Sequence, residues 1–62
     1  MMCLVEYGFM TPTGTVTNKK SHYYTLVCGS ESEALAKLRY DYNTVWKGCA
    51  SGEIVVLNVT KR

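Results

Sequence analysis

The chain has 62 residues, of which 47% are hydrophobic and 19% charged, and its net charge is +2 at pH 7. This length predicts a single domain, residues 1–62, that is too short to enclose a deep active-site pocket, and the composition is that of a globular protein, not a disordered one. The small net charge does not identify a nucleic-acid-binding protein, because such proteins usually carry a larger basic excess.

The N-terminal region lacks the basic and apolar segments of a secretory signal, and no run approaches the roughly 20 apolar residues that span a membrane. We therefore expect a cytoplasmic protein with reduced thiols and no membrane partner. Cys3, Cys28 and Cys49 are an odd number of cysteines without CxxC spacing, and His22 is the single histidine. This pattern argues against a disulfide framework and a zinc site, so we expect no metal and no cofactor.

The first predicted strand covers residues 2–9, which are rich in apolar and aromatic side chains. Its uniformly apolar side holds Cys3, Val5, Tyr7 and Phe9. Residues 10–21 follow as a connection, in which Pro12 and Gly14 favour a turn. Because such a connection is long for so small a domain, part of it could instead extend a strand and make a long hairpin arm.

Residues 22–28 are predicted to form the second strand, and residues 30–48 a helix. Ser30 and Glu33 have the spacing of a capping box, in which each side chain binds a backbone N–H at the start of the helix. Gly48 suits the residue that ends a helix. A helical apolar stripe is expected at Ala34, Leu35, Leu38, Tyr42, Val45 and Trp46.

After a link at residues 49–52, residues 53–60 form the third predicted strand. The order is β-β-α-β, an α+β fold. A right-handed crossover through the helix makes the second and third strands parallel, so the first strand lies between them. We therefore predict a three-stranded antiparallel sheet of strand order 2-1-3, with the helix packed on one face.

A register that pairs Cys3 with Cys28 separates the side chains into two faces. The helix would then cover Cys3, Val5, Tyr7, Phe9, His22, Tyr24, Leu26 and Cys28, together with Val55, Leu57 and Val59. The opposite face would hold Leu4, Glu6, Tyr23, Thr25, Val27, Ile54, Val56, Asn58 and Thr60. A slip of one residue would exchange the two faces.

One helix cannot cover both faces of the sheet, so the second face is expected to carry function. An exposed apolar patch usually marks an interface, and the outer strands also offer edges for pairing with another chain. The residues expected to bind a protein partner are Leu4, Glu6, Tyr23, Val27, Ile54 and Val56. A homodimer through this face is an alternative.

Catalysis has no support in the sequence, since His22 has no nucleophile partner at a motif spacing and no Gly-rich phosphate loop is present. We therefore expect a non-enzymatic protein. A small nucleic-acid-binding protein is the alternative function, because basic and aromatic residues alternate near one end of the predicted hairpin. The residues expected to contact nucleic acid are Lys19, Lys20, Tyr23, Lys61 and Arg62.

The stretch from Tyr24 to Tyr42, with its Ser-Glu-Ser-Glu-Ala-Leu helix start at Ser30–Leu35, and the closing strand Glu53 to Thr60 resemble small phage-encoded inhibitors. The layout is nearest to that of the T-odd phage inhibitors of bacterial RNA polymerase. The resemblance implies a viral or mobile-element protein in the host cytoplasm that inhibits or modulates a host protein. Anti-CRISPR proteins have comparable size and composition, so RNA polymerase, CRISPR and other defence factors are all implied as targets.

Overall fold

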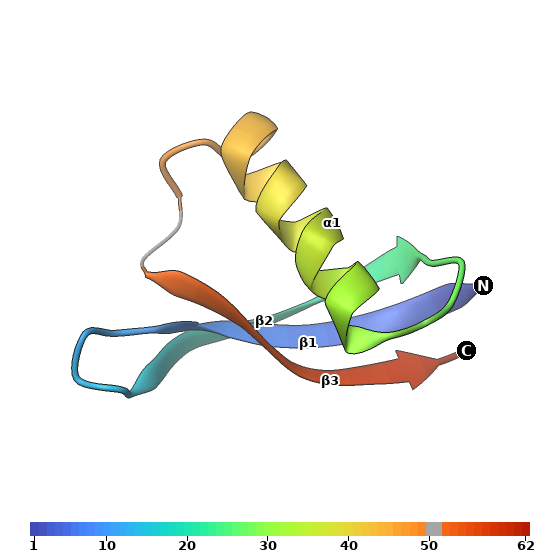
Figure 1. The fold of residues 1–62 in the computed structure, drawn as a ribbon, viewed down its shortest axis with the longest axis horizontal. Helices are drawn as coiled ribbons and strands as arrows, with labels where there is room; N and C mark the ends of the chain where they lie inside the picture. Colours follow the sequence, from blue (N-terminus) through green and yellow to red (C-terminus); the bar gives the residue numbers. More distant parts are fainter. Residues whose placement is uncertain (50–51) are drawn as a thin grey trace.

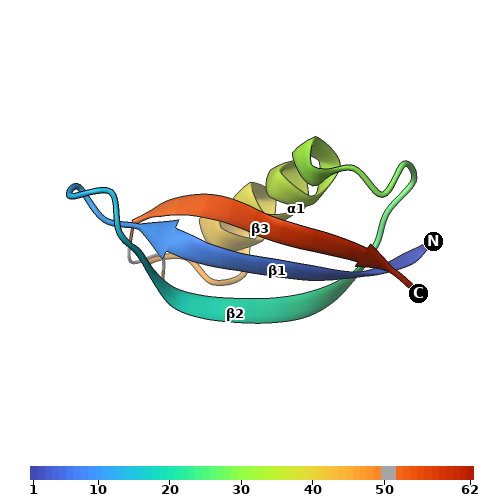
Figure 2. The same cartoon turned by 90° about the horizontal axis from the view of Figure 1, so that it is seen from below.

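The computed structural model describes residues 1–49 and 52–62. Its elements follow the order β1 (Met2–Met10), β2 (Val16–Thr25), α1 (Glu31–Thr44) and β3 (Glu53–Lys61). The strands form one antiparallel sheet in the order β2-β1-β3, and α1 lies on one side of it (Figure 1). The predicted α+β fold and strand order are therefore confirmed. Seen from the other side, the sheet has no helix in front of it (Figure 2).

The core lies between β1 and α1. Both elements bury one face, and Leu26 closes the core after the end of β2. The buried apolar side chains are Cys3, Val5, Tyr7, Phe9, Leu26, Ala34, Leu38 and Tyr42. Burial of each of the larger ones contributes about 1.5–3 kcal/mol to stability.

Two side-chain hydrogen bonds made by tyrosine hydroxyls tie α1 to the sheet. The Tyr7 and Tyr42 hydroxyls lie 2.9 Å apart in the core, and the Tyr24 hydroxyl donates to Asp41 Oδ2 at 2.6 Å. Burial raises the pKa of both Tyr7 and Tyr24 above the usual tyrosine range, and these hydrogen bonds raise it further. Both phenols are therefore held in the neutral form at ordinary pH.

The start of α1 uses half of the predicted capping box. Ser30 Oγ accepts from the Glu33 backbone N–H at 3.2 Å, as predicted. The Glu33 carboxylate, however, accepts the N–H groups of Val27, Cys28 and Gly29 at 2.6, 2.8 and 3.1 Å. These three bonds lower the pKa of Glu33 and link residues 27–29 to the first turn of α1.

The helix ends earlier than predicted, because α1 ends at Thr44 and residues 45–48 form turns. Gly48 does adopt the positive φ, 86°, that was expected of a residue after a helix. Trp46 still packs on the core, whereas Val45 is 68% exposed and does not belong to the buried stripe. The predicted link at residues 49–52 lies partly outside the described residues.

The β1–β2 hairpin has the long arm that was expected as the alternative to a loop, because β2 begins at Val16 and includes the polar residues up to Ser21. Its tight loop is closed by hydrogen bonds from the Thr11 N–H to the Thr15 carbonyl and from the Gly14 N–H to the Thr11 carbonyl. Cys3 pairs with Tyr24 and not with Cys28, so the predicted register was wrong by 28 − 24 = 4 residues. This slip is even, so the predicted faces of β1 and of residues 22–25 are nevertheless right. Val27 and Cys28, which were also assigned to the two faces, lie in the loop after β2 and are exposed.

Two bulges interrupt the sheet. Asn18 and Lys19 lie opposite the single residue Gly8, and Asn18 has a φ of 52°. In β3, Leu57 is the extra residue, because Asn58 pairs with Glu6 while Val56 pairs with Tyr7. This second bulge reverses the side-chain alternation of β3 on one side of Leu57.

Because of the bulge in β3, the predicted faces of this strand were wrong in part. Ile54, Val56 and Val59 pack against the core under α1. Of the three residues predicted on the helix face, only Val59 is there. Val55 pairs with Gly8 and lies on the opposite face, together with Leu57.

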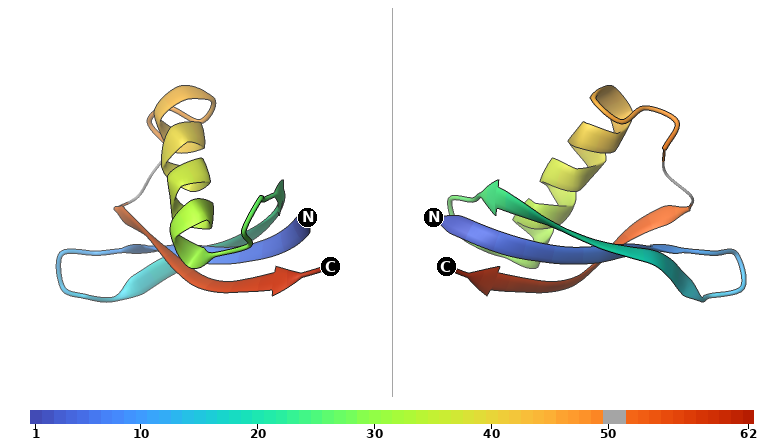
Figure 3. Two further views of the ribbon diagram at one scale, coloured as in Figure 1. Left: turned by 45° about the vertical axis from the view of Figure 1, so that its right-hand side comes forward. Right: turned by 180° about the vertical axis from the view of Figure 1, so that it is seen from behind.

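Figure 3 shows α1 rising from the sheet at a steep angle, with its first turn close to β3 and its last turn farther from the strands. The chain termini lie side by side at one end of the sheet. There the Met1 ammonium group donates to the Leu26 carbonyl at 2.7 Å, and the Arg62 N–H donates to the Met2 carbonyl at 2.9 Å.

Candidate functional site

We call the sheet surface that points away from α1 the uncovered face. Its members are the side chains of the three strands that alternate with the core residues. They are Met2, Leu4, Glu6, Met10, Ser21, Tyr23, Thr25, Val55, Leu57, Asn58 and Thr60. Tyr23 is 58% exposed, Met2 47% and Leu57 42%, so three large apolar or aromatic side chains meet solvent here.

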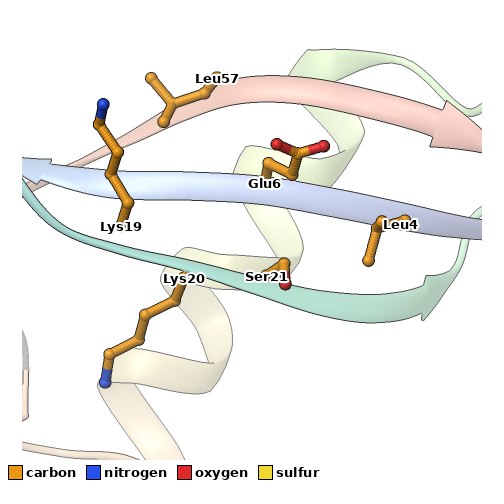
Figure 4. A pocket seen from close by; sticks show the side chains of 6 residues that line it. All are labelled: Leu4, Glu6, Lys19, Lys20, Ser21 and Leu57. Carbon is orange, nitrogen blue, oxygen red and sulfur yellow. The ribbon is translucent and has the colours of Figure 1, made fainter.

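A shallow groove of about 270 Å³ crosses the uncovered face (Figure 4). Glu6 and Leu4 from β1 lie between Leu57 on one side and residues of β2 on the other. The lining residues are Leu4, Glu6, Lys19, Lys20, Ser21 and Leu57. The groove therefore combines apolar side chains with the Glu6 carboxylate and the Lys19 ammonium group, whereas the Lys20 ammonium group points away from it.

Both bulges contribute to this groove. The bulge in β3 adds Leu57 to the uncovered face. The bulge in β2 sends Lys19 across β1 towards Leu57, as Figure 4 shows. The Lys19 stem covers Gly8, since its Cγ lies 3.6 Å from the position that a Cβ on Gly8 would take.

The structure brings together three of the six residues predicted to bind a partner. Leu4 and Glu6 line the groove, and Tyr23 pairs with Leu4 on the same face. Val27 is 85% exposed but follows β2 in the loop and is not part of the sheet. The placement of Ile54 and Val56 on this face was wrong, because both pack against the core.

Leu57 and Lys19 were missed by the sequence prediction as parts of the protein-binding surface. A regular alternation places Leu57 under the helix, and nothing in the sequence of β3 marks the bulge that moves it. The signal for Lys19 is stronger, because Asn is one of the few residues that readily adopt a positive φ, and Asn18 immediately precedes it.

The residues predicted to bind nucleic acid do not form one patch. Tyr23 and Arg62 are in contact, with Arg62 Nη2 donating to the Tyr23 hydroxyl at 3.3 Å and the guanidinium 5.8 Å from the ring centroid. Lys19 lies at the groove, and Lys20 extends past the outer edge of β2 (Figure 4). Lys61 pairs with Cys3 and lies beside Gly29, on the side of the sheet that α1 covers.

A second hollow, the aromatic pocket, lies at the edge of β2 on the helix side. It has a volume of about 210 Å³ and is lined by Lys20, His22, Tyr42, Trp46 and Cys49. The His22 ring is stacked between Tyr7 and Trp46, at centroid distances of 5.6 and 5.1 Å and interplanar angles of 25° and 22°. These contacts hold the ring in a fixed orientation at the strand edge.

Among residues 1–49 and 52–62, no group of three or more His, Cys, Asp or Glu side chains is arranged to hold a metal ion. Cys3 is buried, while Cys28 and Cys49 are exposed free thiols. In the same described part of the chain, no helix is both long and apolar enough to cross a membrane.

Comparison with known proteins identifies no relative. No protein-family model matches the chain, and no curated protein or solved structure matches it significantly.

Proposed function

We propose that this chain is a non-enzymatic protein–protein interaction module that binds its partner through the uncovered face. The observation that carries the proposal is the exposure of Tyr23, Met2 and Leu57 around the groove. Aromatic residues and Met are enriched in protein interfaces, and a central apolar area with polar surroundings is typical of them. Glu6 and Lys19 supply charged groups that can select the partner.

The proposed partner is a host protein, and the proposed effect is its inhibition or modulation by a phage or mobile-element protein. Support for this finer proposal comes from the small size of the chain and from the resemblance of its Tyr24–Tyr42 stretch to phage inhibitors. The host cytoplasm is the proposed site of action, and RNA polymerase, CRISPR effectors and other defence factors are the proposed targets.

The test is affinity capture from bacterial lysate with variants of matched exposure. Tyr23→Ser and Leu57→Lys alter the uncovered face, whereas Tyr40→Ser alters α1, where Tyr40 is 67% exposed. We expect the first two variants to lose the captured partner, with affinity reduced about tenfold or more, as for central interface residues. The Tyr40→Ser control should retain it.

Circular dichroism of each variant checks that the fold is intact. A partner that survives both Tyr23→Ser and Leu57→Lys would contradict binding through the uncovered face. The alternative of a homodimer through this face predicts a concentration-dependent mass in sedimentation that Leu57→Lys abolishes. A monomer of constant mass would exclude this alternative.

Nucleic-acid binding is a second candidate function, which the contact between Tyr23 and Arg62 favours. An exposed aromatic ring beside a guanidinium group can stack on an unpaired base. Binding to single-stranded oligonucleotides should then weaken with increasing salt, and Tyr23→Ser should reduce it strongly. The absence of binding at low salt would remove this candidate.

A further inference from the structure

We propose that the outer edge of β2 and the aromatic pocket beside it bind an extended, acidic segment of a partner protein, which pairs with β2 as an additional strand. This inference rests on the proposed protein-binding function and names a second surface for it. The surface lies at the edge of the sheet and differs from the uncovered face. The chemistry of the segment follows from the residues that line this edge.

β2 lies at the border of the sheet. β1 lies on one side of β2, and no strand among the described residues pairs with its other side (Figure 2). In an edge strand, every second residue directs its backbone N–H and C=O away from the sheet. These groups can form the main-chain hydrogen bonds of an added strand.

The aromatic pocket opens along this edge. Lys20 and His22 are two residues apart on β2 and therefore lie on the same face. Tyr42, Trp46 and Cys49 form the opposite wall of the pocket. A residue that pairs with His22 would direct its side chain into the pocket, where the aromatic rings favour an apolar group.

The edge is also basic. Lys20 extends past the outer side of β2 (Figure 4), and no residue of this strand is acidic. Of the nearby carboxylates, Glu6 lies on the uncovered face, and Asp41 accepts the hydrogen bond of the Tyr24 hydroxyl. The edge therefore favours an acidic chain, since oppositely charged cross-strand pairs are stabilising and like-charged ones are not.

The edge, the pocket and the charge together favour an acidic peptide segment over other occupants. A second copy of this chain that added its own β2 would bring its Lys20 to an edge that already carries the same lysine. A nucleic acid has no backbone amides with which to extend the strand. In an antiparallel addition, the residue opposite His22 should be apolar, and the residue two positions later, opposite Lys20, should be acidic.

The experiment is selection from a displayed library of random linear peptides with the intact protein as bait. We expect enrichment of an apolar residue followed two positions later by Asp or Glu. Binding of the selected peptides should fall about tenfold or more with Lys20→Glu, because an attractive pair becomes a repulsive one. Trp46→Ala should weaken binding of the selected peptides to a similar extent, because it removes one wall of the pocket.

The matched control is Arg39→Glu, which makes the same charge change at an exposed position of α1. It should leave the peptides bound, and chemical-shift mapping should show changes at the amides of residues 20–24. Failure to enrich any peptide, or enrichment of basic ones, would overturn the inference. Peptide binding that is lost in Tyr23→Ser but retained in Lys20→Glu would also overturn the inference. That result would instead support the uncovered face as the binding surface.

Discussion

Replacement of Gly8 by Ala tests the bulge in β2 directly. In an ordinary strand, Gly→Ala is expected to stabilise a protein by about 0.5–1 kcal/mol, because Ala loses less backbone entropy on folding. In this structure, however, a Cβ on Gly8 would lie 2.5 Å from Val16 Cγ1 and 3.3 Å from the Thr17 carbonyl oxygen. Two carbon atoms are normally separated by about 3.5–4.0 Å, so Val16 would have to move by about 1 Å.

The magnitude follows from comparing the two effects. Overpacking of this kind costs about 1–3 kcal/mol, which exceeds the entropic gain. We therefore expect Gly8→Ala to lower the free energy of unfolding by about 1–2 kcal/mol. For a domain of this size, the Tm should fall by about 4–16 °C, since each kcal/mol corresponds to about 4–8 °C.

The assay is urea and thermal unfolding followed by circular dichroism, with Val16→Ala as the companion substitution. Val16→Ala removes the methyl group that the new Cβ would meet, so the double variant should be more stable than the sum of the single effects predicts. A Gly8→Ala protein with a raised Tm would refute the packing of Val16 over Gly8. Strictly additive single effects would refute it as well.

Three further predictions concern the polar groups that join α1 to the sheet and to the loop before it. Tyr7→Phe should destabilise the fold by about 1–3 kcal/mol, because it leaves the buried Tyr42 hydroxyl without its hydrogen-bond partner. Urea unfolding measures this loss. As a control, Tyr40→Phe at an exposed position should change stability by less than about 0.5 kcal/mol. Glu33→Gln should lower the Tm near neutral pH, but not in acid. The pKa of Glu33 is lower in the folded chain than its ordinary value of 4.5. Its contribution to folding stability is therefore present above pH 4.5 and is lost as the pH falls through the folded pKa. A Tm difference that is independent of pH would contradict this prediction. Tyr7 and Tyr24 have a raised pKa in the folded state, so stability should decrease as the pH rises above about 10, the ordinary tyrosine pKa. The tyrosinate absorbance of these two residues should therefore appear together with the loss of the helical circular dichroism signal, and its appearance before unfolding would contradict the prediction.

The strand order, the helix and the buried face of β1 could be predicted because each follows from a strong local pattern. The alternation of Cys3, Val5, Tyr7 and Phe9 is uninterrupted in the sequence and in the structure. The end of β2 was missed because residues 26–28 continue an apolar run typical of a strand. In the structure, the Glu33 carboxylate binds the backbone N–H groups of residues 27–29, and this contact is stronger than their preference for a strand.

The candidate site was predicted only in part, for a different physical reason. Leu4, Glu6 and Tyr23 belong to strands whose alternation is regular over these positions, so their face could be predicted. Ile54 and Val56 could not be placed correctly, because one extra residue at Leu57 moves them to the opposite side. The aromatic pocket depends on contacts between Trp46 and His22 that lie far apart in sequence, and no spacing rule connects them.

The bulge at Leu57 has a consequence for how β3 tolerates a change in length. Without Leu57, the side chains of this strand would alternate regularly, with Ile54, Val56 and Val59 all directed at α1. Deletion of Leu57 should therefore leave both ends of β3 in their present pairing, whereas deletion of Val55 should displace Ile54 or Val56 from the core. One residue thus makes the difference between a regular third strand and one that presents a leucine to the solvent. Length variation in β3 is therefore expected to concentrate at this position.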